Sequence, residues 1–600
     1  MCGFAGAFGN LNLEFNDKKI FNSLKHRGPD SSGKYKSESC IMFHSRLTII
    51  GNTKHGQQPI SNKQNTITLV YNGEIYNWKK LRNYYFPNEK KNIKSDTQII
   101  LKLFEKFGIG FVNKLRGIFS FAIYSKKNKK IYLVRDRFGV KPLYYYKSSK
   151  NIFFATEIKS ILAMSVKKRI NFSILKSYLL ESKLCHNDKT FFKDINSLDP
   201  ATIYEISNFG EKKIKYWRLK NNNHHLSQIK IDSLVSDSIR SNLVADTEVS
   251  VALSSGVDSS VLVGELLRLD KKFKSYSYGY AEKKYSELKD IAIKFRHEKN
   301  LIQNHKTMKI NDVFDKLQKA IYFFETPLGG LGTLSSFDLF SKVNTDNIKV
   351  CLSGEGADEL FGGYKYYYFS WLKSLFIKKK FSELNDEIYK YNQNHEDKLK
   401  LKLLMKFFVD KKKMFAPDGS STYSKDNFFT KQFKEISTSK NYNVNYEKDE
   451  LANEIFKDII WRKLPKLLHF QDRASMANSV ESRVPFLDHE LWDKAFSTNP
   501  QKLFNRGYTK EIMRKIYFKR FNTMPKTKKY VSSPQREWLK YNLKDKLIEN
   551  IRYGKLIENK IINFEKWKKS YDAYSNSNKL GNSFFIWKIL NAELLLKEFF

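Results

Sequence analysis

The hydrophobic pattern of the chain changes once, and this change limits the folds that the chain can adopt. Up to about residue 205, short apolar or alternating runs such as NTITLVYNGEIY and GIFSFAIYS are separated by turns rich in Gly, Asn, Asp and Lys. Such runs predict layered antiparallel sheets with a few helices. After the polar stretch KNNNHHLSQIK, apolar strands end in Gly-rich loops that open helices, which predicts a parallel α/β sheet. We expect a multi-domain α/β protein with domains at residues 1–210 and 225–600.

Composition excludes several classes of protein. A chain of 600 residues with 41% hydrophobic side chains can bury two or more cores, so we do not expect a mainly disordered protein. The 4 cysteines have no C-x-x-C spacing, which argues against a disulfide framework or a zinc ribbon and indicates a reducing compartment. Neither a long uncharged apolar run nor a signal-peptide pattern is present. We therefore expect a cytoplasmic protein that does not span a membrane.

The net charge is strongly positive, with 107 Lys+Arg against 63 Asp+Glu and a formal charge of +44. Such an excess is compatible with a nucleic-acid partner. However, the lysines are spread along the whole chain and no recognition motif accompanies them. We expect no nucleic-acid partner, and we expect the charge to attract anionic substrates instead.

Cys2 follows the initiator Met directly, so removal of Met would make this cysteine the first residue. A terminal cysteine has its own base, because the α-amine (pKa about 7.7 to 8.0) lies next to the thiol (pKa about 8.5). By itself, a cysteine in this position is also typical of an incidental buried residue. The residues that accompany it make the difference.

Those residues suit an attack on an amide of a free amino acid. Asn72 and Gly73 end an apolar run and offer a side-chain amide and a backbone N–H to a developing oxyanion. Arg46 and Asp96 carry opposite charges that match a carboxylate and an ammonium group. The alternatives are an ordinary hairpin turn for Asn72 and Gly73, and surface positions for the two charges.

In this order, MCGFAG, HRGPDSSG, HSRLTIIG, YNGEIYN, SDTQII and RDRFGVKPLYY resemble the glutaminase domain of class II glutamine amidotransferases. The resemblance covers about the first 160 residues and implies an Ntn-type α+β fold of layered antiparallel sheets. It implies that Cys2 attacks the glutamine carboxamide and that Asn72 and Gly73 form the oxyanion hole. The implied ligands of the amino-acid end of glutamine are Arg46, Asn72, Glu74 and Asp96.

A second candidate site begins with LSSGVDSS, from Leu253 to Ser260, between a strand-like and a helix-like run. Serine hydroxyls, a glycine and the N–H groups of a helix start suit a pyrophosphate. Asp258 would be repelled by phosphates unless it holds Mg²⁺. The loop is neither a Walker loop nor a Rossmann fingerprint, and an ordinary capped helix start is the alternative.

This loop resembles the SGGxDS loop of N-type ATP pyrophosphatases. LSGEGADELFGGY, DRASMANSVESRVPFLD and GYTKEIMR resemble asparagine synthetases, so that the likeness covers most of residues 230–540. It implies a sheet of the ATP-pyrophosphatase type, Mg²⁺ at Asp258 and Asp358, and Glu355 as the base acting on ammonia. The implied ATP ligands are Leu253, Ser254, Gly256, Asp258, Ser259, Ser353, Gly354 and Lys510. We interpret DRASMANSVESRVPFLD as a helix and a buried turn outside the site.

The two sites complement each other chemically. A carboxylate becomes reactive when ATP converts it to an acyl-adenylate, and ammonia made from glutamine in a sheltered site arrives unprotonated. The resemblance therefore implies synthesis of asparagine from aspartate, glutamine and ATP, with release of glutamate, AMP and pyrophosphate through a β-aspartyl-adenylate. The sequence leaves open whether the protein forms a homodimer.

Two departures from the family pattern bear on the substrate. Ser255 replaces the first glycine of SGGxDS, and Thr333 stands where asparagine synthetases carry an Arg that grips the aspartate carboxylate. The alternative is a related enzyme that amidates another carboxylate, such as a sugar uronate for surface polysaccharide. A sugar-phosphate amidotransferase would lack SSGVDSS, and a non-catalytic protein would not need Cys2 with its partners. Residues 371–465 carry no motif that we can interpret.

Overall fold

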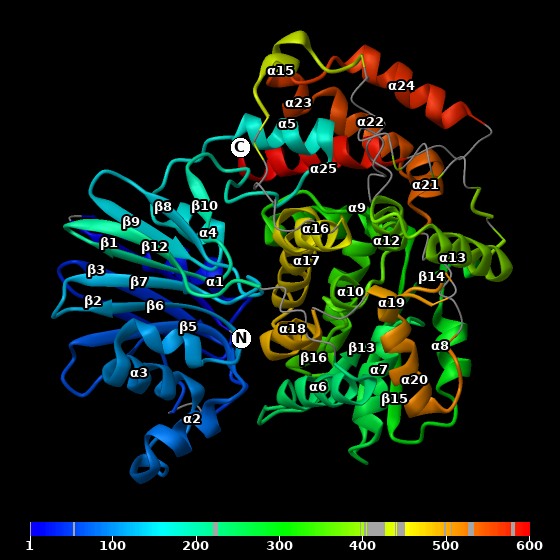
Figure 1. Cartoon of the computed structure of the whole chain (residues 1–600). Coiled ribbons are helices and arrows are strands. Elements are labelled where there is room, and N and C mark those ends of the chain that lie inside the picture. Colours follow the sequence, from blue (N-terminus) through cyan, green and yellow to red (C-terminus); the bar gives the residue numbers. More distant parts are fainter. Residues whose placement is uncertain are drawn as a thin grey trace.

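Two antiparallel sheets form the N-terminal part of the computed structural model (Figure 1). Their strand orders are β10-β8-β9-β1-β3-β2 and β12-β11-β7-β6-β5-β4. The strands of the first sheet are β1 (Gly3–Gly9), β2 (Ser31–Lys36), β3 (Cys40–Arg46), β8 (Tyr144–Lys147), β9 (Asn151–Ala155) and β10 (Ile195–Ser197). Those of the second are β4 (Ile60–Ser61), β5 (Ile67–Ile75), β6 (Gly117–Ser125), β7 (Lys130–Arg135), β11 (Thr202–Ser207) and β12 (Gly210–Lys215). The structure describes residues 2–11, 13–51, 55–219, 226–396, 398–400, 404, 408, 427–438, 440, 450–496, 500–505, 507–525, 533–577 and 583–600.

The alternation of side chains along the strands explains the layers. Phe4 and Phe8 of β1 pack between the two sheets, whereas Ala5 and Ala7 face the helices outside. The outer face of the first sheet is covered by α1 (Asp17–Leu24), α4 (Ile158–Ala163) and α5 (Phe172–Glu181). The outer face of the second sheet is covered by α2 (Trp78–Tyr85) and α3 (Asp96–Phe107). The predicted layered antiparallel sheets are confirmed.

The C-terminal part contains a parallel sheet with the order β15-β14-β13-β16-β17. Its strands are β13 (Val249–Ala252), β14 (Phe273–Tyr280), β15 (Leu301–Met308), β16 (Val350–Leu352) and β17 (Glu481–Arg483). Because β13 and β16 are neighbours, the loops that follow them meet at one edge of the sheet. The predicted parallel α/β sheet is confirmed.

Helices surround this sheet on both faces and form a further layer near the C-terminus (Figure 1). Around the sheet lie α6 (Gln228–Ser241), α7 (Val257–Leu267), α8 (Leu288–Lys294), α9 (Val313–Phe324), α10 (Leu331–Thr345), α11 (Ala357–Phe361), α12 (Lys365–Ile377), α13 (Phe381–Asn394), α16 (Glu450–Lys457), α17 (Leu464–Met476), α18 (His489–Ala495), α19 (Pro500–Leu503) and α20 (Glu511–Phe521). The further layer contains α15 (Lys431–Glu435), α21 (Gln535–Glu537), α22 (Lys544–Arg552), α23 (Lys555–Glu558), α24 (Phe564–Asn576) and α25 (Phe584–Phe599).

The two parts share one apolar core. It runs from the outer face of the first sheet through α9, α10 and α17 to α25, which lies beside α5 in Figure 1. Within the part of the chain that the structure describes, no helix is long and apolar enough to cross a membrane. The sequence predicts no role for residues 371–465. Of these, 397, 401–403, 405–407, 409–426, 439 and 441–449 lie outside the described residues.

Candidate functional site

Cys2 directly precedes β1 and is buried, with 7% of its surface exposed. Its backbone N–H donates to Oδ1 of Asn72 at 3.1 Å, and its carbonyl accepts from Nε of Arg27 at 3.1 Å. Burial raises the pKa of the Cys2 thiol, although the N-terminal charge and Arg46 oppose this effect. The thiol is therefore protonated near neutral pH, and a neighbouring base must take its proton before it can attack.

Asn72 and Gly73 lie within β5 and do not form a hairpin turn. Asn72 is fully buried beside Cys2, and its Nδ2 lies 3.5 Å from the hydroxyl of Ser120. Gly73 has a φ of +144°, and a Cβ at this position would lie 2.1 Å from the carbonyl oxygen of Ile118. Only glycine fits this close approach of two strands.

We expect Gly73→Ala to abolish glutamine-dependent activity, because the added methyl group must push β5 away from β6 and displace Asn72. Gly110→Ala is the matched control, since nothing lies within 4 Å of its Cβ position. Both variants are assayed for glutamine hydrolysis and for thermal unfolding. A Gly73→Ala enzyme with unchanged glutaminase activity would contradict this assignment.

Arg46 and Asp96 are buried, with 3% and 4% of their surface exposed, and are not surface charges. Nη2 of Arg46 donates to the carbonyls of Ile50 and Gly51 at 3.1 and 3.2 Å. Oδ2 of Asp96 accepts from the Tyr71 hydroxyl at 2.9 Å and from the Ile75 N–H at 3.2 Å. Burial raises the pKa of Asp96, and these hydrogen bonds oppose the rise. These hydrogen bonds hold both charged side chains at fixed positions.

Glu74 is held by a residue of the C-terminal domain. Nη2 of Arg483 lies 3.6 Å from Oε1 of Glu74, and Arg483 is fully buried. Burial raises the pKa of Glu74 well above its usual range; the charges of Glu481 and Asp96 add to the rise, and Arg483 opposes it. Arg483 belongs to DRASMANSVESRVPFLD, which the sequence interpretation keeps outside the site, and the structure brings its guanidinium group next to the predicted site residue Glu74.

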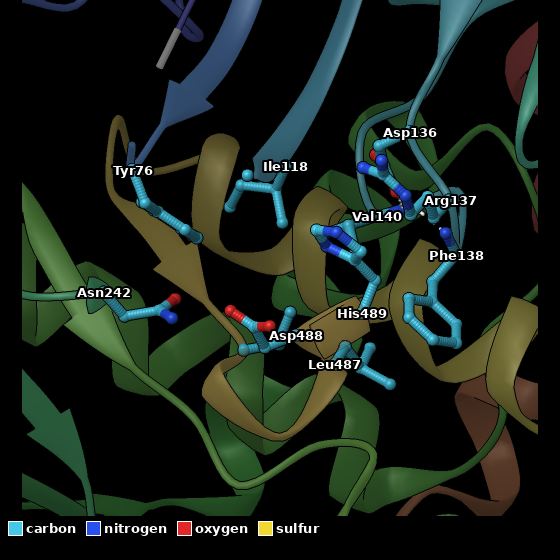
Figure 2. A pocket seen from close by; sticks show the side chains of 12 residues that line it. Tyr76, Ile118, Asp136, Arg137, Phe138, Val140, Asn242, Leu487, Asp488 and His489 are labelled. Atoms are coloured by element: carbon cyan, nitrogen blue, oxygen red, sulfur yellow. Dashed lines mark hydrogen bonds between the residues drawn. The ribbon is translucent and has the colours of Figure 1, made fainter. Parts of the chain in front are cut away.

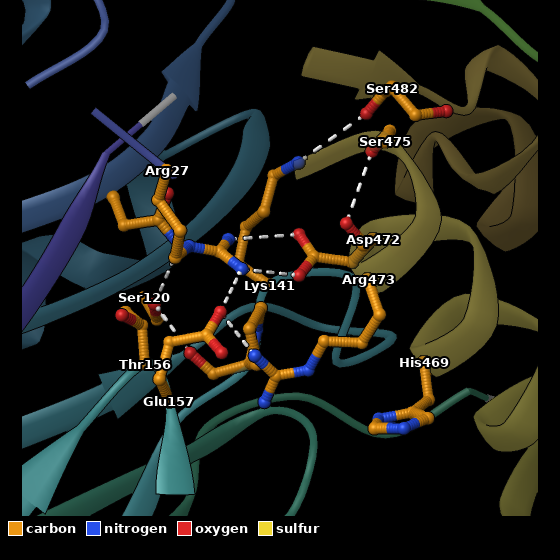
Figure 3. Close-up of polar contacts among 12 residues, drawn as sticks. Arg27, Ser120, Lys141, Thr156, Glu157, His469, Asp472, Arg473, Ser475 and Ser482 are labelled. Carbon is orange, nitrogen blue, oxygen red and sulfur yellow. Dashed lines mark hydrogen bonds and ion pairs between the residues drawn. The ribbon is translucent and has the colours of Figure 1, made fainter. Parts of the chain in front are cut away.

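The same segment supplies a buried ion network between the two domains (Figure 3). Nη1 of Arg27 lies 2.7 Å from Glu157 and 2.9 Å from Asp472. Arg473 pairs with Glu157 and lies 2.8 Å from Glu325. The predicted helix is present as α17. The buried turn is also present, at Pro485–Leu487. Asp472 and Arg473 of α17 connect Cys2, through Arg27, with Glu325, the first residue of ETPLGGLGTLSS.

The Ser-rich loop joins β13 to α7, as the sequence predicts. The hydroxyls of Ser254 and Ser259 are 3.0 Å apart, and the Ser259 hydroxyl accepts from the Ser254 N–H at 3.1 Å. Gly256 is the N-cap of α7 and makes no side-chain cap. Leu253 is fixed by its N–H bond to the Tyr276 carbonyl at 2.8 Å. The serines therefore shape the loop and do not cap the helix.

The second predicted loop follows β16 and packs directly on the first. A Cβ at Gly354 would lie 3.3 Å from Cβ of Asp258, so the two loops are in contact. The Ser353 N–H donates to the Arg483 carbonyl at 2.8 Å, and its hydroxyl lies 3.5 Å from Oε1 of Glu355. The structure thus brings together two segments that are about a hundred residues apart in the sequence.

Lys510 connects the two loops. Its Nζ lies 2.5 Å from Asp258 and 2.6 Å from Asp358, and although burial opposes the effect, these carboxylates raise the pKa of Lys510. Among the described residues, no group of three or more His, Cys, Asp or Glu side chains is arranged to hold a metal ion. Two carboxylates from facing loops suit Mg²⁺ only when phosphate oxygens complete the coordination. The donor set therefore fits a magnesium–nucleotide complex.

The C-terminal helices hold the loop that precedes α10. Thr333 lies in the first turn of α10. The Leu328 N–H donates to Asn591 at 3.0 Å, and the Leu331 N–H donates to Gln535 at 2.9 Å. A Cβ at Gly332 would lie 3.9 Å from the hydroxyl of Tyr278. Neither Gln535 nor Asn591 lies in a motif that the sequence interpretation used.

A cavity between the domains lies apart from these residues (Figure 2). Tyr76, Ile118 and Asp136 line it from the N-terminal domain, and Asp488 and His489 line it from the C-terminal domain. Burial, with the charges of two neighbouring arginines, lowers the pKa of His489 to about 2. None of the predicted site residues lines the cavity.

The fold and the two sites define the class of the protein: an ATP-dependent ligase that hydrolyses glutamine. A glutamine amidotransferase domain model matches residues 1–217, and the asparagine synthase model matches residues 230–597. The chain belongs to the asparagine synthase family.

Relatives in this family match most of the chain. "Asparagine synthetase [glutamine-hydrolyzing] 1" of Bacillus subtilis is 27% identical over 99% of this chain and 97% of the relative. "Asparagine synthetase B [glutamine-hydrolyzing]" of Escherichia coli is 28% identical over 61% of this chain and 65% of the relative. "Amidase chry2" of Gibberella zeae is 27% identical over 57% of this chain and 54% of the relative. Similarity at this level gives the family and not the acceptor.

Proposed function

We propose that the protein is a glutamine-hydrolysing asparagine synthetase, which forms asparagine from aspartate, glutamine and ATP and releases glutamate, AMP and pyrophosphate. The observation that carries this proposal is the junction of the two loops at Lys510. A lysine and two aspartates from separate loops are the charges that a magnesium–polyphosphate needs. The four cysteines are free, which suits a reducing compartment, and we place the reaction in the cytoplasm.

In the first site, the Cys2 thiol attacks the glutamine carboxamide after the α-amine of a processed chain takes its proton. Asn72 and the Gly73 N–H stabilise the oxyanion, while Arg46, Glu74 and Asp96 hold the amino-acid end of glutamine. Ammonia leaves and the thioester is hydrolysed to glutamate. The buried thiol with its raised pKa supports the need for this base.

In the second site, a carboxylate oxygen of the acceptor attacks the α-phosphorus of ATP, and pyrophosphate leaves. Leu253, Ser254, Gly256, Ser259, Ser353 and Gly354 bind the nucleotide, and Lys510 neutralises the pyrophosphate. Mg²⁺, when bound to Asp258 and Asp358, would reduce the charge repulsion among the phosphates. Ammonia then attacks the acyl carbon, Glu355 takes the proton that ammonia loses, and AMP leaves.

A second candidate keeps this chemistry but changes the acceptor to another carboxylate, such as a sugar uronate. Thr333 favours it, because this half-buried residue in the first turn of α10 carries no charge for the aspartate α-carboxylate. A lost charge-assisted bidentate contact weakens binding about ten- to a hundred-fold unless another residue compensates. Lys510 and Glu355, on family positions, favour aspartate.

Exchange of labelled pyrophosphate into ATP distinguishes these acceptors, because the exchange requires the carboxylate to be adenylated. We expect exchange with aspartate and a KM for aspartate in the micromolar-to-millimolar range that is usual for enzymes. A panel of uronates and a reaction without acceptor are measured in parallel. Exchange with a uronate and none with aspartate would select the second candidate, and no exchange with any carboxylate would contradict both.

A further inference from the structure

The helix α8 (Leu288–Lys294) holds the phosphate loop from behind, through residues at its two ends. Glu287, the N-cap of α8, accepts from the Ser255 N–H at 3.1 Å. Lys294, the last residue of α8, donates to the Ser255 carbonyl at 3.2 Å and to the Ser260 hydroxyl at 2.7 Å. The backbone of Ser255 is thus fixed on both sides by one short helix.

These contacts explain why serine is tolerated where related loops carry glycine. Ser255 is not among the residues with a positive φ, so its backbone conformation does not require glycine. Its carbonyl is taken up by an ammonium group. A carbonyl oxygen that faces a phosphate is repelled by it. Because Lys294 holds the Ser255 carbonyl away from the bound anion, the N–H groups at the start of α7 are the groups that face the anion.

Lys294, at the end of α8, is half-buried and contacts α7 and α20. Its Nζ lies 4.6 Å from the centre of the Tyr517 ring of α20 and 5.4 Å from that of Phe295. Glu287 is the charged group of α8 that acts on it, while α7 presents the uncharged Ser260. The Asp258–Lys510 ion pair also lies at the phosphate loop.

We infer that Lys294 is a positioning residue of the nucleotide site: its ammonium group fixes Ser255 and adds a positive charge behind the phosphate loop. The inference rests on the proposed binding of ATP at residues 253–260. By this inference α8 takes part in binding the phosphates. Neither the motif of the phosphate loop nor the match to the family gives α8 this role.

The charge of Lys294 is expected to change within the working range of the enzyme. Burial lowers its pKa to about 8, and Glu287 opposes the shift. Lys294 is therefore charged at neutral pH and loses its charge as the pH rises through about 8. Because bound ATP favours the charged form, the KM for ATP should rise above this pH.

The test measures ATP–pyrophosphate exchange with a saturating acceptor and no glutamine, so that the first site does not contribute. We expect Lys294→Met to raise the KM for ATP about ten-fold with a smaller change in kcat, which is the size usual for a lost hydrogen bond from a charged group. We expect Lys294→Arg to bind ATP nearly as wild type and to lack the rise in KM above pH 8, because arginine does not titrate there.

Lys289→Met is the matched control, since Lys289 is an exposed lysine of the same helix. An unchanged KM for ATP in Lys294→Met would overturn the inference. If Lys294→Met does not fold, the Lys294→Arg profile decides, and an alkaline rise equal to that of the wild type would overturn it as well. Absence of exchange in the wild-type enzyme with every acceptor contradicts the proposed function instead, so the two failures are distinguishable.

Discussion

Replacing Cys2 by alanine is expected to abolish glutamine-dependent synthesis while ammonia-dependent synthesis persists. The thiol is the only group that the proposal places in covalent contact with glutamine, and Cys2 directly precedes β1 in the N-terminal domain. The phosphate and acceptor loops belong to the C-terminal sheet and its helices. Loss of a nucleophile costs several orders of magnitude in rate, so glutamine-dependent turnover should fall to background.

Asparagine formation is measured with glutamine and, separately, with an ammonium salt at alkaline pH. Cys185→Ala is the matched control, because it removes another thiol of the same domain, in a half-buried position. Loss of both activities in a Cys2→Ala protein that remains folded would argue against separable sites. Retained glutamine-dependent activity would remove Cys2 from the mechanism.

Asp258→Asn is expected to abolish ATP-dependent activation while glutamine hydrolysis continues at its basal rate. The substitution removes one of the two carboxylates that flank Lys510 and that we propose to hold Mg²⁺. Asparagine keeps the size of the side chain but supplies no charge for the metal. A loss of about a hundred- to a thousand-fold in pyrophosphate release is expected, which is the size of effect known for a single electrostatic group at a reacting centre.

Asp315→Asn, in an exposed position on α9, is the control for loss of one acidic residue from the same domain. Pyrophosphate release is measured over a range of Mg²⁺ concentrations, and glutaminase activity is measured in the same preparations. An Asp258→Asn enzyme with the Mg²⁺ dependence and rate of the wild type would exclude this carboxylate from the site.

The sequence predicts those parts of the molecule that depend on local pattern. The alternating strands and the Gly-rich strand–helix junctions follow from periodicity. The pairing of the loops after β13 and β16 is implied by the family resemblance, because periodicity does not give the order of strands in a sheet. The burial of Arg46 and Asp96 was an open alternative, because a charge in a short motif has no periodicity to show which way it faces. The structure resolves it in favour of buried positions.

Contacts between distant segments could not be predicted in this way. Arg483 meets Glu74 across the domain boundary, and Arg27 meets Asp472 over 445 residues of sequence. Each of these residues is compatible with a local structural role in its own segment. Only the packing of the N-terminal sheets against the C-terminal part brings these residues together.

The buried ion network also limits how this chain can be divided or recombined. Arg27 and Glu157 come from one domain, and Asp472, Arg473 and Glu325 from the other, all with at most 5% of their surface exposed. Removing one partner from a buried pair leaves an uncompensated charge, which costs about 3 to 5 kcal/mol. A fragment ending near residue 217 would expose this charged face to solvent. Without Asp472, Arg27 would no longer be fixed in position to donate its hydrogen bond to the Cys2 carbonyl. A chimaera that takes its glutaminase domain from a relative should therefore work only when that domain carries the complementary charges at the positions of Arg27 and Glu157.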